Sequence, residues 1–254
     1  MFINSEGLPT YEAKDVGLIT KKYQDYKFDK SVVITGNEQQ QYMAVVLKSI
    51  EQFAPELVSS TSHLTHGLVK MAGGVKMSSR KGNILRALDI LDAANEEKKK
   101  ASDSDDQEIV LGAVKYAFLK VRTGGDIIYD PEESVSMLGN SGPYLQYAHA
   151  RARSILTKTN LKDAKLSDLE TGERSLVRKI GEYAEVIDKA VDELMPHLVC
   201  TYLYELAQVF NRFYENNRVV GDSREAVRAK LVGLYADRLK EGLELLGIVA
   251  PERM

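Results

Sequence analysis

The chain has 254 residues, of which 44% are hydrophobic and 28% charged, and its formal net charge is −3. This composition is typical of a folded globular protein of one or two domains, and the charge argues against bulk binding of polyanions. No apolar run reaches the roughly 18–20 residues of a membrane span, and the first residues do not resemble a secretory signal. The single cysteine, Cys200, excludes internal disulfides and is expected to be buried and unreactive. The sequence also has only four histidines, so we expect no metal site of its own. We expect a cytoplasmic protein that does not bind a membrane.

The first hundred residues predict helices and strands in alternation. Residues 11–26 have apolar side chains at helical spacing, and Thr10 is suited to cap the free backbone N–H groups of that helix. Residues 31–35 (SVVIT) predict a short buried strand, residues 40–53 a second helix and residues 64–69 a second strand. A strand, a helix and a strand in succession form a βαβ unit of a parallel sheet, which binds ligands at the carboxyl ends of its strands.

A glycine-rich basic loop, GGVKMSSRKGN at residues 73–83, follows the last of these strands. Its glycines allow backbone conformations that other residues resist, and its basic side chains can stabilise charge that develops on a phosphate. The loop therefore suits a phosphate clamp, although it lacks the spacing of a P-loop. Composition alone leaves open a flexible basic surface turn.

From residue 83 onward the pattern is mostly helical. Residues 95–108 are dense in lysines and acids and predict a solvated helix end and loop, and residues 126–130 predict a strand or an extended connector. Beyond them apolar residues recur at spacings of three and four, which is typical of a helical bundle. Its helices are expected at residues 141–156, 173–194, 196–217 and 223–247.

Four stretches of the sequence resemble one enzyme family. KMSSR, at residues 76–80, resembles the Lys-Met-Ser-Lys-Ser signature of class I aminoacyl-tRNA synthetases, and its continuation as KMSSRKGN resembles arginyl-tRNA synthetase. Residues 8–15 (LPTYEAKD), 139–156 (GNSGPYLQYAHARARSIL) and 242–254 (GLELLGIVAPERM) resemble stretches of that family in the same order. The resemblance implies an α/β, partial Rossmann-like catalytic segment followed by an all-α helical-bundle anticodon-binding domain.

The resemblance also implies where the domains begin and end. It places the C-terminal half of a Rossmann-like catalytic domain at residues 1–94, a helical connector at 95–138 and the anticodon-binding domain at 139–254. The family's His-Ile-Gly-His-like motif, which holds the ATP phosphates, has no counterpart around any of the four histidines. We therefore expect a C-terminal portion of the enzyme with half an active site, which binds tRNA but forms no adenylate alone.

In this family a tyrosine and an aspartate one helical turn apart contact the guanidinium group of arginine, and Tyr11 and Asp15 match that pattern. Residues at positions i and i+4 share a helix face, and a carboxylate pairs with a planar guanidinium through two charge-assisted hydrogen bonds. Gln39 corresponds by register to another residue of the arginine site. The alternatives are an aspartate that only stabilises the helix N-terminus and an exposed glutamine within NEQQQ.

An ATP site is implied in and just before the glycine-rich loop. Where the class I signature has its second lysine this chain has Ser79, so we expect Lys81 to supply that charge. The implied reaction is attack of the arginine carboxylate on the α-phosphate of ATP, used with Mg²⁺, and then transfer to the terminal ribose of tRNA. Positioned cations and amides assist such a step without a covalent nucleophile. The residues expected at the phosphates are Lys76, Ser78, Ser79 and Lys81, and those nearer the other end of the nucleotide are His66, Gly67 and Met77.

Aromatic and basic side chains of the predicted bundle match residues that bind the anticodon loop in this family. Unpaired RNA bases are recognised by stacking and edge contacts, for which tyrosine and methionine are suited. Before the resemblance is considered, tyrosines at helical spacing are more simply core residues. The residues expected to contact tRNA are Tyr144, Tyr147, Arg151, Tyr214 and Met254, with Arg153, Arg212 and Arg218 as further phosphate contacts.

The sequence as a whole thus predicts a monomeric arginine–tRNA ligase, or its C-terminal part, with tRNA(Arg), arginine and ATP as partners. A non-catalytic RNA-binding module that has lost the chemistry is the first alternative. A nucleotidyl transferase with an unrelated helical tail is the second. The match of residues 139–156 and 242–254 disfavours the latter.

Overall fold

The computed structural model describes residues 1–72, 86–101, 106–159 and 164–254. The described chain forms two compact units. The N-terminal unit comprises Met1–Val69 with Thr123–Asp126, and the helical unit comprises Lys70–Arg122 with Ile127–Met254. The glycine-rich loop at residues 73–83 lies outside the described residues.

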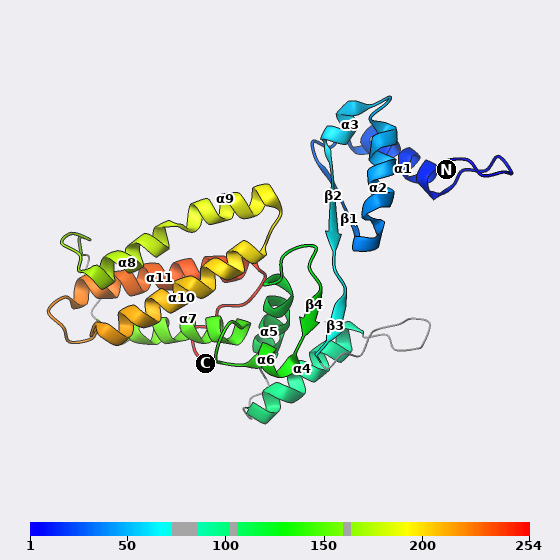
Figure 1. Cartoon of the computed structure of the whole chain (residues 1–254). Coiled ribbons are helices and arrows are strands. Elements are labelled where there is room, and N and C mark those ends of the chain that lie inside the picture. The colour runs from blue at the N-terminus through cyan, green and yellow to red at the C-terminus, as the bar shows by residue number, and fades with distance from the viewer. Residues whose placement is uncertain (73–85, 102–105, 160–163) are drawn as a thin grey trace. The chain divides into compact units, whose positions relative to one another are not determined.

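The N-terminal unit contains a parallel βαβ arrangement, as the sequence predicts (Figure 1). Strands β1 and β2 pair in parallel, with Ser31 opposite Thr61 and Gly36 opposite His66. Helices α1 and α2 contribute Ile19 and Val46 to one small apolar core, because their buried residues recur at helical spacing. The elements are α1 (Tyr11–Tyr26), β1 (Ser31–Gly36), the 3-10 helix η1 (Asn37–Gln39), α2 (Gln40–Ile50), α3 (Pro55–Ser59) and β2 (Thr61–His66).

Three expectations for this unit are wrong. Strand β1 is not buried: Val33 packs on the core, but the side chain of Ile34 is 66% exposed, because alternate residues of a strand point to opposite faces and the core covers one of them. Thr10 precedes α1 but does not cap it, since its hydroxyl donates to the carbonyl of Met1 at 2.6 Å. The strand expected at residues 64–69 is interrupted after β2, where Gly67 lies against the backbone of Gly125.

The helical unit is a bundle with one main apolar core. Phe210 and Tyr235 stack at its centre with ring centroids 3.8 Å apart, and Cys200 is buried in the same core. Burial raises the pKa of the Cys200 thiol to about 12, so it is inert at neutral pH. The helices are α4 (Ala87–Ala101), α5 (Gln107–Leu119), α6 (Pro131–Val135), α7 (Gly142–Leu156), α8 (Thr171–Gly181), α9 (Tyr183–Glu193), α10 (His197–Asn216) and α11 (Glu225–Leu245), and β3 (Val69–Met71) pairs with β4 (Ile127–Tyr129).

The single helix expected at residues 173–194 is divided into α8 and α9. The hydroxyl of Tyr202, from α10, donates to the carbonyl oxygens of Lys179 and Ile180 at 3.0 and 3.3 Å. These carbonyls lie at the end of α8, where backbone acceptors otherwise lack partners. Tyr202, which is distant in sequence, thus stabilises the division between α8 and α9.

A buried ion network joins α8 to α11. Glu173 is fully buried and accepts hydrogen bonds from Arg224 at 2.5 Å and from Arg228 at 3.0 Å. Arg228, itself buried, also donates to Glu170 at 2.9 Å. Buried charges require such pairing, because an unpaired charge in a dry interior is costly. The hydrogen bonds from Arg224 in particular lower the pKa of Glu173 to about 2.

The fold class expected from the sequence is confirmed: an α/β segment with a parallel strand pair precedes an all-α bundle. Within the four described ranges, none of the helices is both long enough and apolar enough to cross a membrane. In the same ranges no group of three or more His, Cys, Asp or Glu side chains is arranged to hold a metal ion.

Candidate functional site

Two adjoining cavities of the N-terminal unit, of about 460 and 530 Å³, share Asp15, Gln39 and Tyr42. Asp15 lies on the second turn of α1, and Gln39 ends the 3-10 helix that follows the carboxyl end of β1. This is the edge of a parallel strand at which α/β proteins bind ligands. We call the two cavities together the acidic groove, since Glu12 also lines the larger one, while Lys22, which lines the smaller one, donates to the hydroxyl of Ser31.

The structure brings the three residues predicted for arginine binding to the acidic groove. Tyr11 lies one helical turn before Asp15, and both line the larger cavity with Gln39. The ring of Tyr11 is 79% exposed, and the ammonium group of Lys14 lies 5.4 Å from its centroid. A carboxylate, an amide and an accessible aromatic ring are groups that bind a guanidinium ion by hydrogen bonds and by stacking.

Tyr42 is a residue of this groove that sequence reasoning missed. Its hydroxyl donates a hydrogen bond to Oδ2 of Asp15. Burial and this contact raise the pKa of Tyr42 to about 12, so the hydroxyl keeps its proton at neutral pH. The signal in the sequence is its position three residues after Gln39, which places the two on neighbouring positions of one helical face.

The described part of the predicted ATP site lies at the carboxyl end of β2. Nδ1 of His66 is 2.9 Å from the carbonyl oxygen of Gly67. A Cβ atom at Gly67 would lie 2.2 Å from the carbonyl oxygen of Gly125, so this position requires glycine. The other predicted residues, Lys76, Met77, Ser78, Ser79 and Lys81, lie outside the described residues.

A second candidate site lies on the helical unit, between α7 and the C-terminal residues. It is a groove of about 860 Å³, lined among others by Tyr147, Arg151 and Met254. The side chains of Tyr147 and Met254 are 42% and 48% exposed. The structure therefore brings three of the five predicted tRNA-binding residues together from positions about one hundred residues apart. We call this the α7–tail groove.

Hydrogen bonds fix the C-terminal tail along α7 (Figure 1). Gln146 donates to the carbonyl of Val249 at 2.9 Å, and Nδ1 of the buried His149 lies 2.8 Å from the carbonyl of Pro251. Since a carbonyl only accepts, Nδ1 bears the hydrogen, and burial lowers the pKa of His149 below its usual range. An ion pair of 2.6 Å between Arg153 and Glu252 adds to these contacts. These contacts fix the tail from Val249 to Glu252, two residues before Met254.

The remaining two predicted residues lie beside the α7–tail groove without lining it. The Tyr144 hydroxyl accepts a hydrogen bond from Asn211 at 2.8 Å, and burial raises its pKa. The Tyr214 ring stacks on Phe210 with centroids 6.2 Å apart, and the guanidinium carbon of Arg151 lies 4.8 Å from its centroid. Tyr214 therefore orients Arg151 by a cation–π contact.

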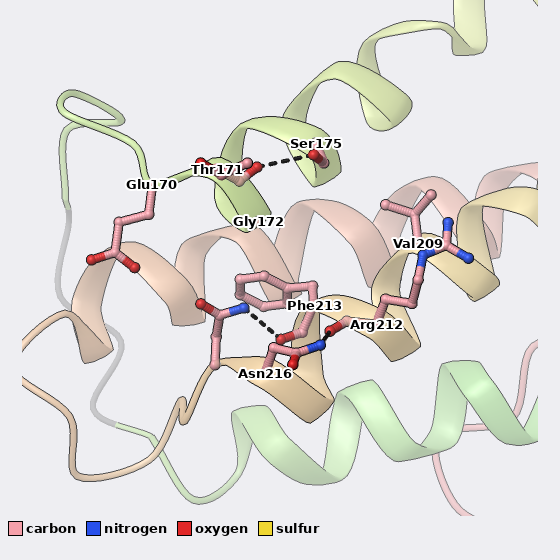
Figure 2. Close-up of a pocket in the computed structure, with 9 residues that line it drawn as sticks. Glu170, Thr171, Gly172, Ser175, Val209, Arg212, Phe213 and Asn216 are labelled. Carbon is pink, nitrogen blue, oxygen red and sulfur yellow. Dashed lines mark hydrogen bonds between the residues drawn. The ribbon is translucent and has the colours of Figure 1, made fainter.

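Of the other arginines considered from sequence, Arg153 also lines the α7–tail groove, whereas Arg212 and Arg218 do not. Nε of Arg218 donates to the carbonyl of Val220 at 2.9 Å, and Arg153 is paired as described. Arg212 lines a separate cavity of about 520 Å³ between the first turns of α8 and the last turns of α10 (Figure 2). Phe213 and Val209 line the same cavity, and most of its other lining residues are polar.

Comparison with known proteins assigns both parts of the chain. The family profile described as "tRNA synthetases class I (R), catalytic domain" matches residues 1–130, and the profile "DALR anticodon binding domain" matches residues 145–254. The chain belongs to the arginyl-tRNA synthetase family. It therefore combines a class I catalytic segment with a DALR helical domain, as the resemblance of its motifs implies.

Individual relatives agree with this assignment. The arginine–tRNA ligase of Flavobacterium psychrophilum is 32% identical over 272 residues, which is 99% of this chain and 45% of the relative. That of Porphyromonas gingivalis is 30% identical over all of this chain and 46% of the relative. The structure of Thermus thermophilus arginyl-tRNA synthetase superposes with a TM-score of 0.85 at 26% identity, over 100% of this chain and 50% of that one. The chain thus spans about half the length of the family members it matches.

Proposed function

We propose that this chain contributes the arginine-binding and anticodon-binding surfaces of an arginine–tRNA ligase. The full reaction activates arginine with ATP and Mg²⁺ to arginyl-adenylate and transfers the arginyl group to tRNA(Arg). The observation that most supports the proposal is the placement of Tyr147, Arg151 and Met254 along one groove in a chain of this family. The acidic groove supports it separately, with Asp15 and Gln39 at the edge of the parallel strands.

The acidic groove accounts for the choice of arginine among amino acids. A guanidinium is planar and offers five N–H donors, and the groove presents acceptors at Asp15, Gln39 and Glu12. Lysine has a compact ammonium group that cannot make a forked pair with one carboxylate. The ring of Tyr11, being exposed, is available for stacking on the plane of the guanidinium.

The α7–tail groove is suited to bases of an unpaired loop. Tyr147 and Met254 supply exposed apolar surface, and Arg151 supplies a planar cation whose position the Tyr214 ring fixes. Bases bind such surfaces by stacking, and a guanidinium can stack or contact a phosphate. The mild negative charge of the whole chain is compatible with this, because the basic group is local.

We also propose that this chain alone does not form arginyl-adenylate. The residues of the glycine-rich loop would hold one side of the triphosphate, with Lys81 in place of the second signature lysine. No stretch of the sequence resembles the His-Ile-Gly-His motif of the family. Domain limits at residues 94 and 138, a monomeric state and a cytoplasmic location remain parts of this proposal.

RNA binding by variants of the α7–tail groove tests the proposal. Tyr147→Ala and Arg151→Ala should each weaken binding of an anticodon stem-loop that reads arginine codons by about tenfold, since stacking contributes roughly 1–3 kcal/mol per base. Fluorescence anisotropy with a labelled stem-loop gives the dissociation constants. Tyr144 is a poor probe, because its hydroxyl and ring are engaged within the protein.

The matched control is Arg178→Ala, which removes an equal charge from an 87% exposed side chain of α8. This variant should bind the stem-loop as the wild-type chain does. Equal affinity of the Tyr147, Arg151 and Arg178 variants would contradict the assignment of the groove. Binding of RNA without any binding of arginine would favour the non-catalytic RNA-binding module.

A further inference from the structure

The carboxylate of Asp15 has one hydrogen-bond donor in the described part of the chain, the hydroxyl of Tyr42. The donor comes from α2 and the acceptor from α1, so the contact joins the two helices that flank the acidic groove. It involves Oδ2 alone. Both side chains line both cavities of the groove, together with Gln39.

This contact restricts the orientation of the Asp15 carboxylate. An isolated aspartate rotates about its terminal torsion, which has broad preferences, so its two oxygens are not fixed in space. A hydrogen bond to one oxygen fixes the plane of the carboxylate, while each oxygen retains a lone pair for a ligand. Two parallel hydrogen bonds from a guanidinium require such a fixed plane, whereas a point-like ammonium does not.

The tyrosine is suited to this task at any pH at which the enzyme would work. Its ring is partly buried and packs on the core formed by Ile19, Met43 and Val46, so its position is fixed by packing. The hydroxyl remains protonated at neutral pH and therefore stays a hydrogen-bond donor to Asp15. A neutral donor leaves the negative charge of Asp15 for the ligand.

We propose that Tyr42 is a positioning residue for arginine, which orients the Asp15 carboxylate for a forked pair with the guanidinium group. The proposal rests on the proposed function, because it requires that the acidic groove bind arginine. It adds a residue that contributes to selectivity through another side chain. The hydroxyl of Tyr42, and not its ring, is the group responsible.

Titration of the intact chain with L-arginine and with L-lysine, followed by nuclear magnetic resonance, tests the role of the hydroxyl. Tyr42→Phe should weaken arginine binding by about tenfold, the usual size of a hydrogen bond to a charged group, and leave the weak binding of lysine unchanged. Tyr42→His, whose ring N–H can donate to the same carboxylate, should restore part of the loss. The control is Tyr23→Phe, which removes a hydroxyl from another tyrosine packed on the same core.

A double-mutant cycle separates positioning from a structural effect. In an Asp15→Asn background, Tyr42→Phe should cause less than a twofold further loss, since the hydroxyl then has no carboxylate to orient. Thermal unfolding of each variant shows whether it is folded. If Tyr42→Phe is not folded, the arginine affinity of Tyr42→His tests the same contact. If the wild-type chain binds arginine and Tyr42→Phe binds it equally well, the role of Tyr42 is overturned while the arginine site stands. The same holds if Tyr42→Phe loses affinity for arginine and for lysine equally. No arginine binding by the wild-type chain would overturn the arginine site and this inference with it.

Discussion

Replacing Glu173 with glutamine is expected to lower the free energy of unfolding of the helical unit by about 1.5–3 kcal/mol at pH 7, the usual contribution of hydrogen bonds to a charged group. The carboxylate is fully buried and accepts hydrogen bonds from Arg224 and Arg228. The amide keeps the shape but removes a fully buried negative charge, so Arg224 and Arg228 each lose a charge-assisted hydrogen bond. Arg228 keeps Glu170 at 2.9 Å and Asp222 at 3.3 Å as countercharges. Urea unfolding followed by helical circular dichroism measures the loss.

The same substitution should change how stability depends on pH. The pKa of Glu173 lies at about 2 in the fold, against an ordinary value of 4.5. A lowered pKa gives stability that is fully present above about 4.5 and is lost as pH falls toward 2. The difference between wild type and Glu173→Gln should therefore be large at pH 7 and shrink across that window.

A matched control for this prediction is Glu182→Gln. Glu182 accepts a hydrogen bond from Lys179 at 2.8 Å, but its side chain is 39% exposed. Surface pairs of this kind contribute about 0–1 kcal/mol, so this variant should unfold almost as the wild-type chain does. Equal stabilities of the Glu173 and Glu182 variants at pH 7 would show that the buried network is not a main source of stability.

Replacing Asp15 with asparagine is expected to weaken arginine binding by about 30-fold or more, since losing one partner of a hydrogen-bonded charge pair costs about 2–5 kcal/mol. The amide retains one acceptor but lacks the negative charge and the second acceptor for the guanidinium. Titration of the chain with L-arginine, by calorimetry or nuclear magnetic resonance, gives the two dissociation constants.

Asp25→Asn provides the control on the same helix. Asp25 pairs with Lys21 at 2.6 Å on the surface of α1 and does not line the acidic groove. Its replacement removes an equal charge and should leave arginine binding unchanged. If both variants bound arginine equally, Asp15 would have no direct part in the site and its position near the helix start would be the simpler explanation.

Local patterns were enough to predict most elements of the fold. The periodicity of residues 11–26 predicts α1 with its observed bounds, and the parallel pairing of β1 with β2 follows from the order strand, helix, strand. The failures have tertiary causes. Ile34 is apolar but exposed because the core covers the other face of β1, and α8 ends where Tyr202 from a distant helix donates to its last carbonyls.

The candidate sites show the same division between local and distant causes. The spacing of Tyr11 and Asp15 on one helix is visible in the sequence, and both line the acidic groove. The contact of Tyr42 with Asp15 joins two helices, and a tyrosine at helical spacing predicts only a core position. Likewise, no sequence pattern shows that the Tyr214 ring is engaged by Arg151 instead of lining the α7–tail groove.

The most direct test of the proposed function is the affinity of the chain for two tRNA transcripts that differ in the anticodon alone. One is a tRNA(Arg) transcript, and the other has the same sequence with the anticodon bases replaced. We expect the first to bind at least about tenfold more tightly, the contribution of one or two stacked bases. Equal affinity for the two transcripts would contradict an anticodon-reading surface at Tyr147, Arg151 and Met254.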